Sequence, residues 1–513
     1  MSTVYGAAAT RDRQGWFFGL TGGQWSLVVL FAAPAWMAMA MQRWLLLVPL
    51  IPAWIVVSLL VCVPIRGWSA FQWLGVLGRF LLGQITGWSR FQSRAAAGEI
   101  DLGDPDDPEE EREADEADLP GVLTGIQIHD GPPLPGQPSR PAVIQNHPAR
   151  TWAATARITH PGIGMADLDE RDRMGAGLAE LFEAASANNQ IDLVALQVRT
   201  VPDDGTERAD WVRGNIRDRV PRLSMMVASQ LAALTEGTAV RNEAFVTVVV
   251  REETLARDAK HAGRGVTGRA RVLYGILAEV EARLTGQVGC TSVNWLDTSE
   301  LASAIRSGFE PGDAAALADA AIHAHELARD AAGVPVAAAG PTNASTAMRY
   351  YRHGNWVSTS STIMLPRKGA LMGALARALV PSQPGERRAL TVFYKPVPNA
   401  VASRKTGRAE VSAEMGATLN RKLGRTERAR DRKARQQVHE VDEKLEHGRS
   451  LVKVYGAISI TVPGHWNPQD YGRRLDASVR LCGFAPLPVD GAHDAGFVAA
   501  AIPLGVGLPK QRK

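Results

Sequence analysis

Two long apolar stretches near the start of the chain limit what it can fold into more than any other feature. They cover residues 25–41 and 44–63, and only Gln42 and Arg43 separate them. About 20 apolar residues cross a hydrocarbon layer of about 30 Å, and a backbone in lipid must satisfy its own hydrogen bonds as a helix. The sequence therefore predicts a transmembrane helical hairpin at 25–64.

The basic residues around these stretches predict the orientation of the hairpin. They are Arg11 and Arg13 before it, Arg43 at its tip, and Arg66, Arg79, Arg90 and Arg94 after it. By the positive-inside rule, both chain ends lie in the cytoplasm, including a tail at 1–24. We therefore expect a multi-pass protein of the inner (plasma) membrane. A signal peptide cleaved near Ala38-Met39-Ala40 and a buried pair of soluble helices remain alternatives.

Residues 65–94 differ from the two stretches because arginines interrupt their apolar pattern. The apolar positions that follow a helical stripe are Trp68, Phe71, Leu74, Leu77, Leu81 and Trp88. This pattern predicts an amphipathic helix that lies at a membrane interface. A core helix of the soluble part would show a similar stripe.

Charge is distributed unevenly along the chain. The net charge is +4, but residues 101–118 carry 11 carboxylates and one arginine. A run of like charge without aromatic residues cannot bury a core. We therefore predict an acidic disordered linker at 95–120, with docking to a basic partner as the alternative.

From residue 121 onward the pattern alternates between strands and helices. Strands are predicted at 122–128, 151–159, 191–200, 245–250, 290–296, 350–365, 390–397 and 452–462. Helices are predicted at 165–188, 222–237, 265–285, 301–309, 408–447 and 467–481. We expect 350–365 and 390–397 to pair with each other.

This order of elements predicts a membrane-anchored α+β fold. Its cytoplasmic part would be a split-βαβ, ferredoxin-like sandwich with helices on one face of a mainly antiparallel sheet. We expect one lobe at 121–240 and a second at 241–513, which includes the long basic helix at 408–447.

The motifs that would carry catalysis are absent from the sequence. No Gly-Lys dipeptide occurs, so a phosphate-binding P-loop is excluded, and there is no GxSxG. His323, His325 and Glu326 lack the spacing of a zinc site. The cysteines Cys62, Cys290 and Cys482 are expected to be packed rather than reactive, and the glycines at 263–268 are expected in a loop. We therefore predict no catalytic, cofactor-binding or metal-binding residues, and a chain that is not an enzyme.

The strongest signal in the predicted soluble part is a basic segment. Residues 404–449 contain 13 Lys/Arg against eight Asp/Glu. Such a helix could contact DNA phosphates or anionic lipid headgroups, for example through Arg428, Arg430 and Arg432. A solvated helix with internal ion pairs is the alternative.

Two local segments carry a resemblance to known secretion proteins. Residues 290–311 (CTSVNWLDTSELASAIRSGFEP) and 482–509 (CGFAPLPVDGAHDAGFVAAAIPLGVGLP) look like parts of the N-terminal domain of the type IV secretion and conjugation ATPase. The hairpin followed by an α+β part also resembles EccE-like components of the actinobacterial type VII translocon. The resemblance covers only the N-terminal domain of the ATPase and not its motor domain. It therefore implies that the motor is a separate polypeptide.

This resemblance implies a non-catalytic inner-membrane component of an actinobacterial secretion or conjugative-transfer machine. Its partners would be other membrane subunits and a separate motor ATPase, with anionic lipid headgroups and, more weakly, nucleic acid as further contacts. We expect it to be oligomeric. A membrane-tethered enzyme of the cell envelope and a membrane-anchored DNA-binding module remain alternatives.

Overall fold

The structure is a computed structural model. It describes residues 22–508 except 63, 66–67, 88, 101–114, 135–139, 165, 203–210, 213, 217–218, 236–239, 318–319, 321–333, 365–372, 399–400, 402–442 and 444–449.

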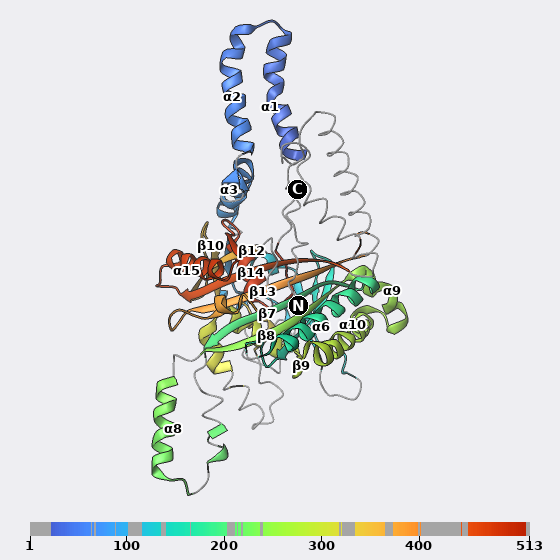
Figure 1. Cartoon of the computed structure of the whole chain (residues 1–513), viewed down its shortest axis with the longest axis vertical. Helices are drawn as coiled ribbons and strands as arrows, with labels where there is room; N and C mark the ends of the chain where they lie inside the picture. The colour runs from blue at the N-terminus through green and yellow to red at the C-terminus, as the bar shows by residue number, and fades with distance from the viewer. Residues whose placement is uncertain are drawn as a thin grey trace.

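The two apolar stretches form a pair of helices, α1 (Gly22–Ala40) and α2 (Trp44–Cys62), which pack side by side and project from the rest of the molecule (Figure 1). Each helix has 19 residues, and α1 begins with Gly22, Gly23 and Gln24. Among the described residues, no helix combines the length and the apolar character needed to cross a membrane. The predictions of a transmembrane hairpin, a membrane-anchored fold and a multi-pass inner-membrane location are therefore wrong.

The centre of the molecule is a mostly antiparallel sheet of 13 strands. Its order is β3-β10-β11-β12-β14-β13-β7-β8-β6-β5-β4, with β15 also paired to β12 and β9 to β6. The strands are β3 (Arg90–Gln92), β4 (Ile126–His129), β5 (Val143–Asn146), β6 (Thr151–Thr159), β7 (Ile191–Pro202), β8 (Val240–Arg251), β9 (Ser292–Trp295), β10 (Asn343–Thr346), β11 (Tyr351–His353), β12 (Trp356–Met364), β13 (Arg387–Val397), β14 (Leu451–Pro463) and β15 (Ala485–Pro488). A separate two-stranded sheet joins β1 (Pro64–Ile65) to β2 (Trp68–Ser69).

The large sheet consists of two halves with the same strand connections. In the first half β6 pairs with β5, β8 and β9, and β8 pairs with β7. In the second half β12 pairs in the same way with β11, β14 and β15, and β14 pairs with β13. The halves meet where β7 pairs antiparallel with β13, so one continuous sheet runs through both. The tertiary structure therefore contains an internal repeat.

Helices cover both faces of this sheet. One face packs against α6 (Leu168–Asn188), α10 (Gly265–Arg283) and α15 (Pro468–Leu481), and the other against α11 (Thr298–Phe309) and α16 (His493–Ala501). In β8, Phe245 and Val249 face α11 and α16, whereas Val246 and Val248 face α6 and α10. A strand buried on both faces carries apolar side chains at nearly every position. This explains the run FVTVVV at 245–250, in which only Thr247 is polar.

Most predicted elements of residues 121–508 have counterparts in the structure. The strand at 151–159 has the predicted bounds, the helix predicted at 165–188 runs from 168 to 188, and the strand at 452–462 lies within β14. The predicted pairing of 350–365 with 390–397 is wrong, because β14 lies between β12 and β13 and pairs with both. Alternating residues predict a strand, but they do not identify its neighbour.

The predicted lobe boundary at 240/241 falls at the start of β8, which pairs with β7 along its whole length. The predicted interfacial helix at 65–94 corresponds to α3 (Ala70–Thr86) followed by β3. Nearly all of the predicted basic helix at 408–447, including Arg428, Arg430 and Arg432, lies outside the described residues.

Candidate functional site: the helical hairpin and its attachment

The pair α1–α2 presents a large apolar surface to solvent. Its exposed large apolar side chains are Val29, Leu30, Phe31, Trp36, Met37, Met39, Met41, Trp44, Leu45, Leu46, Val48, Ile51, Ile55, Val56 and Leu59. Trp36 is 76% exposed and Leu45 is 88% exposed. Contiguous apolar patches of this kind mark surfaces that other molecules cover. We call this surface the hairpin surface.

Contacts between the two helices hold the hairpin surface in shape. Ala38, Leu47 and Val61 are buried, and the indole Nε1 of Trp54 donates a hydrogen bond of 3.0 Å to the carbonyl of Val28. At the tip, Gln42 takes a left-handed backbone conformation (φ 54°), so the chain reverses within a few residues. The helices therefore form a defined unit.

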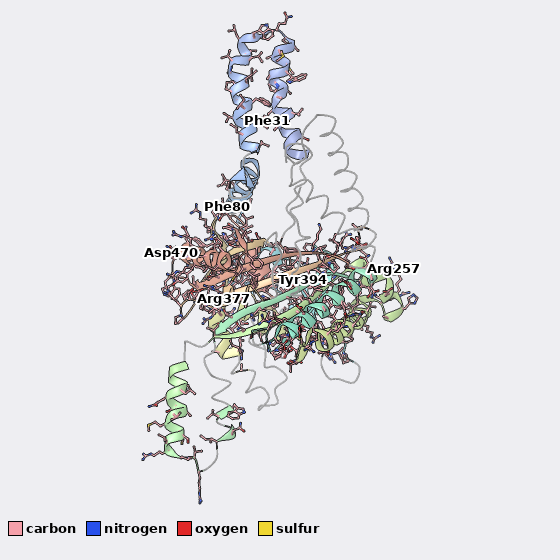
Figure 2. The ribbon with its side chains drawn as sticks, viewed as in Figure 1. Phe31, Phe80, Arg257, Arg377, Tyr394 and Asp470 are labelled. Atoms are coloured by element: carbon pink, nitrogen blue, oxygen red, sulfur yellow. The ribbon has the colours of Figure 1, made fainter. Side chains whose placement is uncertain are left out.

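A short strand fixes the hairpin to the sheet. After α3 the chain forms β3, which pairs antiparallel with β10 at the edge of the second half. Gln84 at the end of α3 donates from Nε2 to the carbonyl of Thr346 (3.3 Å), and the Thr346 amide donates to the carbonyl of Ser89 (2.9 Å). Figure 2 shows Phe31 on the hairpin and Phe80 on α3, on the same side of the sheet. The hairpin is therefore attached to the edge of the sheet through α3 and β3.

The end of the predicted acidic linker also lies at this junction. The Arg94 amide, in the first turn of α4 (Arg94–Ala97), donates to the Asp118 carboxylate (2.7 Å), and the Arg94 side chain forms an ion pair with Glu116 (3.2 Å). A carboxylate beside free amides at a helix start is favourable. These contacts bring residues 94 and 118 together at the edge of the sheet.

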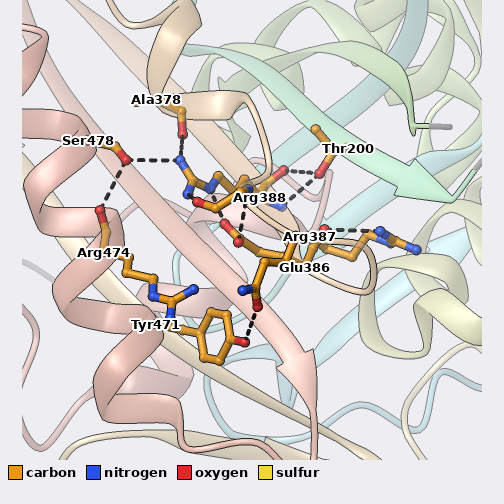
Figure 3. Close-up of polar contacts among 10 residues, drawn as sticks. Thr200, Ala378, Glu386, Arg387, Arg388, Tyr471, Arg474 and Ser478 are labelled. Carbon is orange, nitrogen blue, oxygen red and sulfur yellow. Dashed lines mark hydrogen bonds and ion pairs between the residues drawn. The ribbon is translucent and has the colours of Figure 1, made fainter. Parts of the chain in front are cut away.

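A buried ionic network lies at β13, the edge of the second half that is farthest from β3 in the strand order. Here Arg388 and Glu386 form an ion pair, and their side chains are 1% and 0% exposed (Figure 3). The Arg388 guanidinium also donates to the Ala378 carbonyl (2.9 Å) and to the hydroxyls of Ser382 (2.9 Å) and Ser478 (3.2 Å). The network therefore joins β13 to α15 and to the loop before β13. It has a structural role.

The most strongly perturbed acid among the described residues packs against the turn between β11 and β12. Glu310 follows α11, and burial raises the pKa of its carboxyl from 4.5 to about 7. This carboxyl occupies the space that a Cβ on Gly354 would take, and Gly354 has a φ of 49°. Nearby, His353 is fully buried, its pKa is lowered by burial to about 3, and its Nδ1 donates to the Phe309 carbonyl (2.6 Å). Glu310 and Phe309 belong to the first half, and Gly354 and His353 belong to the second, so these two contacts join the halves.

The structure places the other residues considered in the sequence as follows. His323, His325, Glu326 and the side chain of Cys62 lie outside the described residues. Cys290 is buried, which raises the pKa of its thiol, and Cys482 is half-buried beside the α15 core. Of the predicted glycine loop, residues from Gly265 onward already belong to α10. Within the described part of the chain, no cluster of three or more His, Cys, Asp or Glu could hold a metal ion.

Sequence reasoning identified the apolar residues of the hairpin surface, but not Glu310 or the Arg388 network. Glu310 is one acid among 53 Asp and Glu, and no local pattern distinguishes it. Its environment comes from a turn 44 residues further along the chain.

Comparison of the chain with protein-family models finds no match, and comparison with curated proteins finds none either.

Proposed function

We propose that this chain is a non-catalytic structural component of a secretion or conjugative-transfer machine, in which it scaffolds a separate motor ATPase. The observation that carries the proposal is the hairpin surface, attached to the sheet through α3 and β3. An apolar surface held on a rigid base suits a subunit that is built into a larger assembly.

The sheet supports the same role. It extends through both halves without interruption, and helices bury both of its faces. Its buried charged groups, such as Arg388 and Arg199, bond to other groups of the protein and hold elements together. A body of this kind can hold a partner at a fixed distance from the hairpin.

Site-specific photo-crosslinking in the native cell tests the proposal. A photoreactive residue replaces Trp36 or Leu45 in the full chain, and the crosslinked partners are identified by mass spectrometry. We expect subunits of a transport machine, with the motor ATPase in the same isolated complex. Leu481 on α15, which is 89% exposed, provides the matched control position.

Two results would contradict the proposal. One is that the hairpin positions crosslink no protein beyond those that the Leu481 position captures. The other is that the captured proteins are unrelated to transport and that deleting the gene leaves secretion and DNA transfer unchanged.

A further inference from the structure

Strand β12 has a gap in its pairing, and a histidine fills it. On one side of β12, β11 pairs with residues 356–358 and β15 with residues 361–364, which leaves Thr359 and Ser360 between them. The Ser360 carbonyl accepts the amide of Val489 (3.2 Å), and the Ser360 amide donates to Nδ1 of His493 (3.1 Å). The imidazole of His493 therefore takes the place of a strand partner at the start of α16.

This hydrogen bond determines the protonation state of the ring. His493 is 1% exposed, and Nδ1 must be unprotonated because it accepts from the Ser360 amide. The neutral ring then carries its proton on Nε2. Among the described residues this buried Nε2 has no hydrogen-bond partner, and the Asp490 carboxylate lies 3.7 Å away. Nδ1 is thus the site of any further proton, and a proton there would face the Ser360 amide.

The first half of the sheet has a different group at the equivalent position. There the Thr155 carbonyl of β6 accepts the amide of Leu296 (3.0 Å), as Ser360 accepts that of Val489. Four residues after Leu296 comes Glu300, which forms a capping box with Asp297 at the start of α11. Four residues after Val489 comes His493, with Asp490 in the place of Asp297. The second half therefore has a titratable imidazole where the first half has a capping carboxylate.

Three carboxyl groups lie around His493. Asp490 precedes it in the turn, Asp494 follows it on α16, and Asp476 contributes from α15, where Arg480 lies near Asp476. From β12 come only the hydroxyls of Ser360 and Ser361, and from β11 the phenol of Tyr351, which lies near Asp494. Burial raises the pKa of Asp476 and of Asp494, and the Asp490 carboxylate, 3.7 Å from Nε2, is the group that faces the free edge of the ring.

The two ends of α16 are held differently. Near its C-terminal end the Ala500 carbonyl accepts from both Gln197 of β7 (3.0 Å) and Thr391 of β13 (2.9 Å), so both halves hold this end. Two hydrogen bonds through Ser360 tie the 489–492 turn and the start of α16 to β12, and one of them passes through Nδ1 of His493. The Gly491 amide of the same turn donates to the Met348 carbonyl (2.8 Å). A change at His493 would therefore act on the N-terminal end alone.

We propose that His493 is a proton-operated latch that holds the N-terminal end of α16 to β12. In its neutral form Nδ1 accepts from the Ser360 amide and the latch is closed. Protonation places two N–H donors opposite each other, so the ring leaves Ser360 and turns toward Asp490. The 489–492 turn then separates from β12, and the latch opens at acidic pH.

Hydrogen exchange in the full chain tests this proposal. We expect protection of the amides at 489–496, corrected for the intrinsic effect of pH on exchange, to fall about tenfold or more between pH 8 and pH 5. His493→Asn is the decisive variant, because its Oδ1 can accept from Ser360 but does not titrate. Its protection should stay high at both pH values. His493→Leu removes the acceptor and should lower protection at both.

His147→Asn, at an exposed histidine, is the matched control and should retain the pH response of the wild type. The proposal fails if wild-type protection at 489–496 does not change with pH. It also fails if His493→Asn loses protection at pH 5 as the wild type does. Neither result depends on His493→Leu folding, or on the proposed transport role.

Discussion

Glu310 shows how one buried carboxyl can give the whole protein a pH dependence. Its folded-state pKa of about 7 lies above the ordinary value of 4.5, because burial disfavours the charged form. The folded state thus holds a proton that the unfolded chain releases. The resulting stability is fully present below pH 4.5 and is lost as the pH rises to about 7.

We therefore expect Glu310→Gln to remove part of the pH dependence of stability. Between pH 4.5 and pH 8, the unfolding free energy of the wild type should fall by up to about 3 kcal/mol more than that of the variant. Urea denaturation at the two pH values measures this difference. An equal change with pH in both proteins would show that Glu310 ionises freely in the folded state.

The pair Arg388–Glu386 makes a second prediction at the scale of residues. Removing one member of a buried ion pair leaves an uncompensated charge, which typically costs about 3–5 kcal/mol. We expect Arg388→Met to lower the unfolding free energy by this amount, as measured by denaturation in urea. Arg473→Met is the control, because the Arg473–Asp470 pair is exposed and such pairs contribute about 0–1 kcal/mol. Similar losses in the two variants would contradict the structural role given to the buried network.

At the scale of elements, two helix glycines have opposite environments. Gly177 of α6 packs against the backbone of Gln287, and an added Cβ would lie 2.5 Å from its carbonyl oxygen. Gly275 of α10 has no atom within 4 Å of the same position. The close approach at Gly177 lets α6 pack against the π-helical turn Leu284–Val288 that follows α10, whereas Gly275 only weakens its helix.

We expect the same substitution to have opposite effects at these positions. Gly275→Ala should stabilise the protein by up to about 1 kcal/mol, because alanine favours the helix. Gly177→Ala should destabilise it by about 1–3 kcal/mol, because the backbone must move. Thermal denaturation of the two variants measures both effects. If Gly177→Ala were stabilising, α6 would not pack as closely as the structure shows.

At the scale of the whole molecule, the pairing of β7 with β13 makes the two halves one folding unit. Phe393 of β13 lies at this junction, is 1% exposed and stacks on Tyr455 of β14. Arg199 of β7 bonds to carbonyls of Ala304 and Ala501, which belong to helices of different halves. Contacts that cross the junction should therefore couple the unfolding of both halves.

Phe393→Ala tests this coupling. The loss of a buried aromatic side chain should cost about 3–5 kcal/mol. Because β8 and β14 belong to one sheet, hydrogen exchange should show that their protection falls together. Loss of protection in β14 alone would mean that the halves unfold independently.

The sequence alone determined most of the individual elements. Periods of 2 and 3.6 residues depend only on local order, so 151–159 is predicted as a strand and 165–188 as a helix close to their observed bounds. The apolar character of 25–41 and 44–63 likewise predicted two helices. Local pattern could not decide what surrounds those helices, and the expected membrane span was wrong.

Only the tertiary structure decided which strands are neighbours and which polar residues matter. Strand β14 lies between β12 and β13, and the internal repeat is visible in strand connections rather than in repeated residues. Glu310 and His493 acquire their properties from Gly354 and Ser360, which lie 44 and 133 residues away in the chain. The free energy of a buried polar group depends on the partners that folding brings to it, and a single sequence records the group but not those partners.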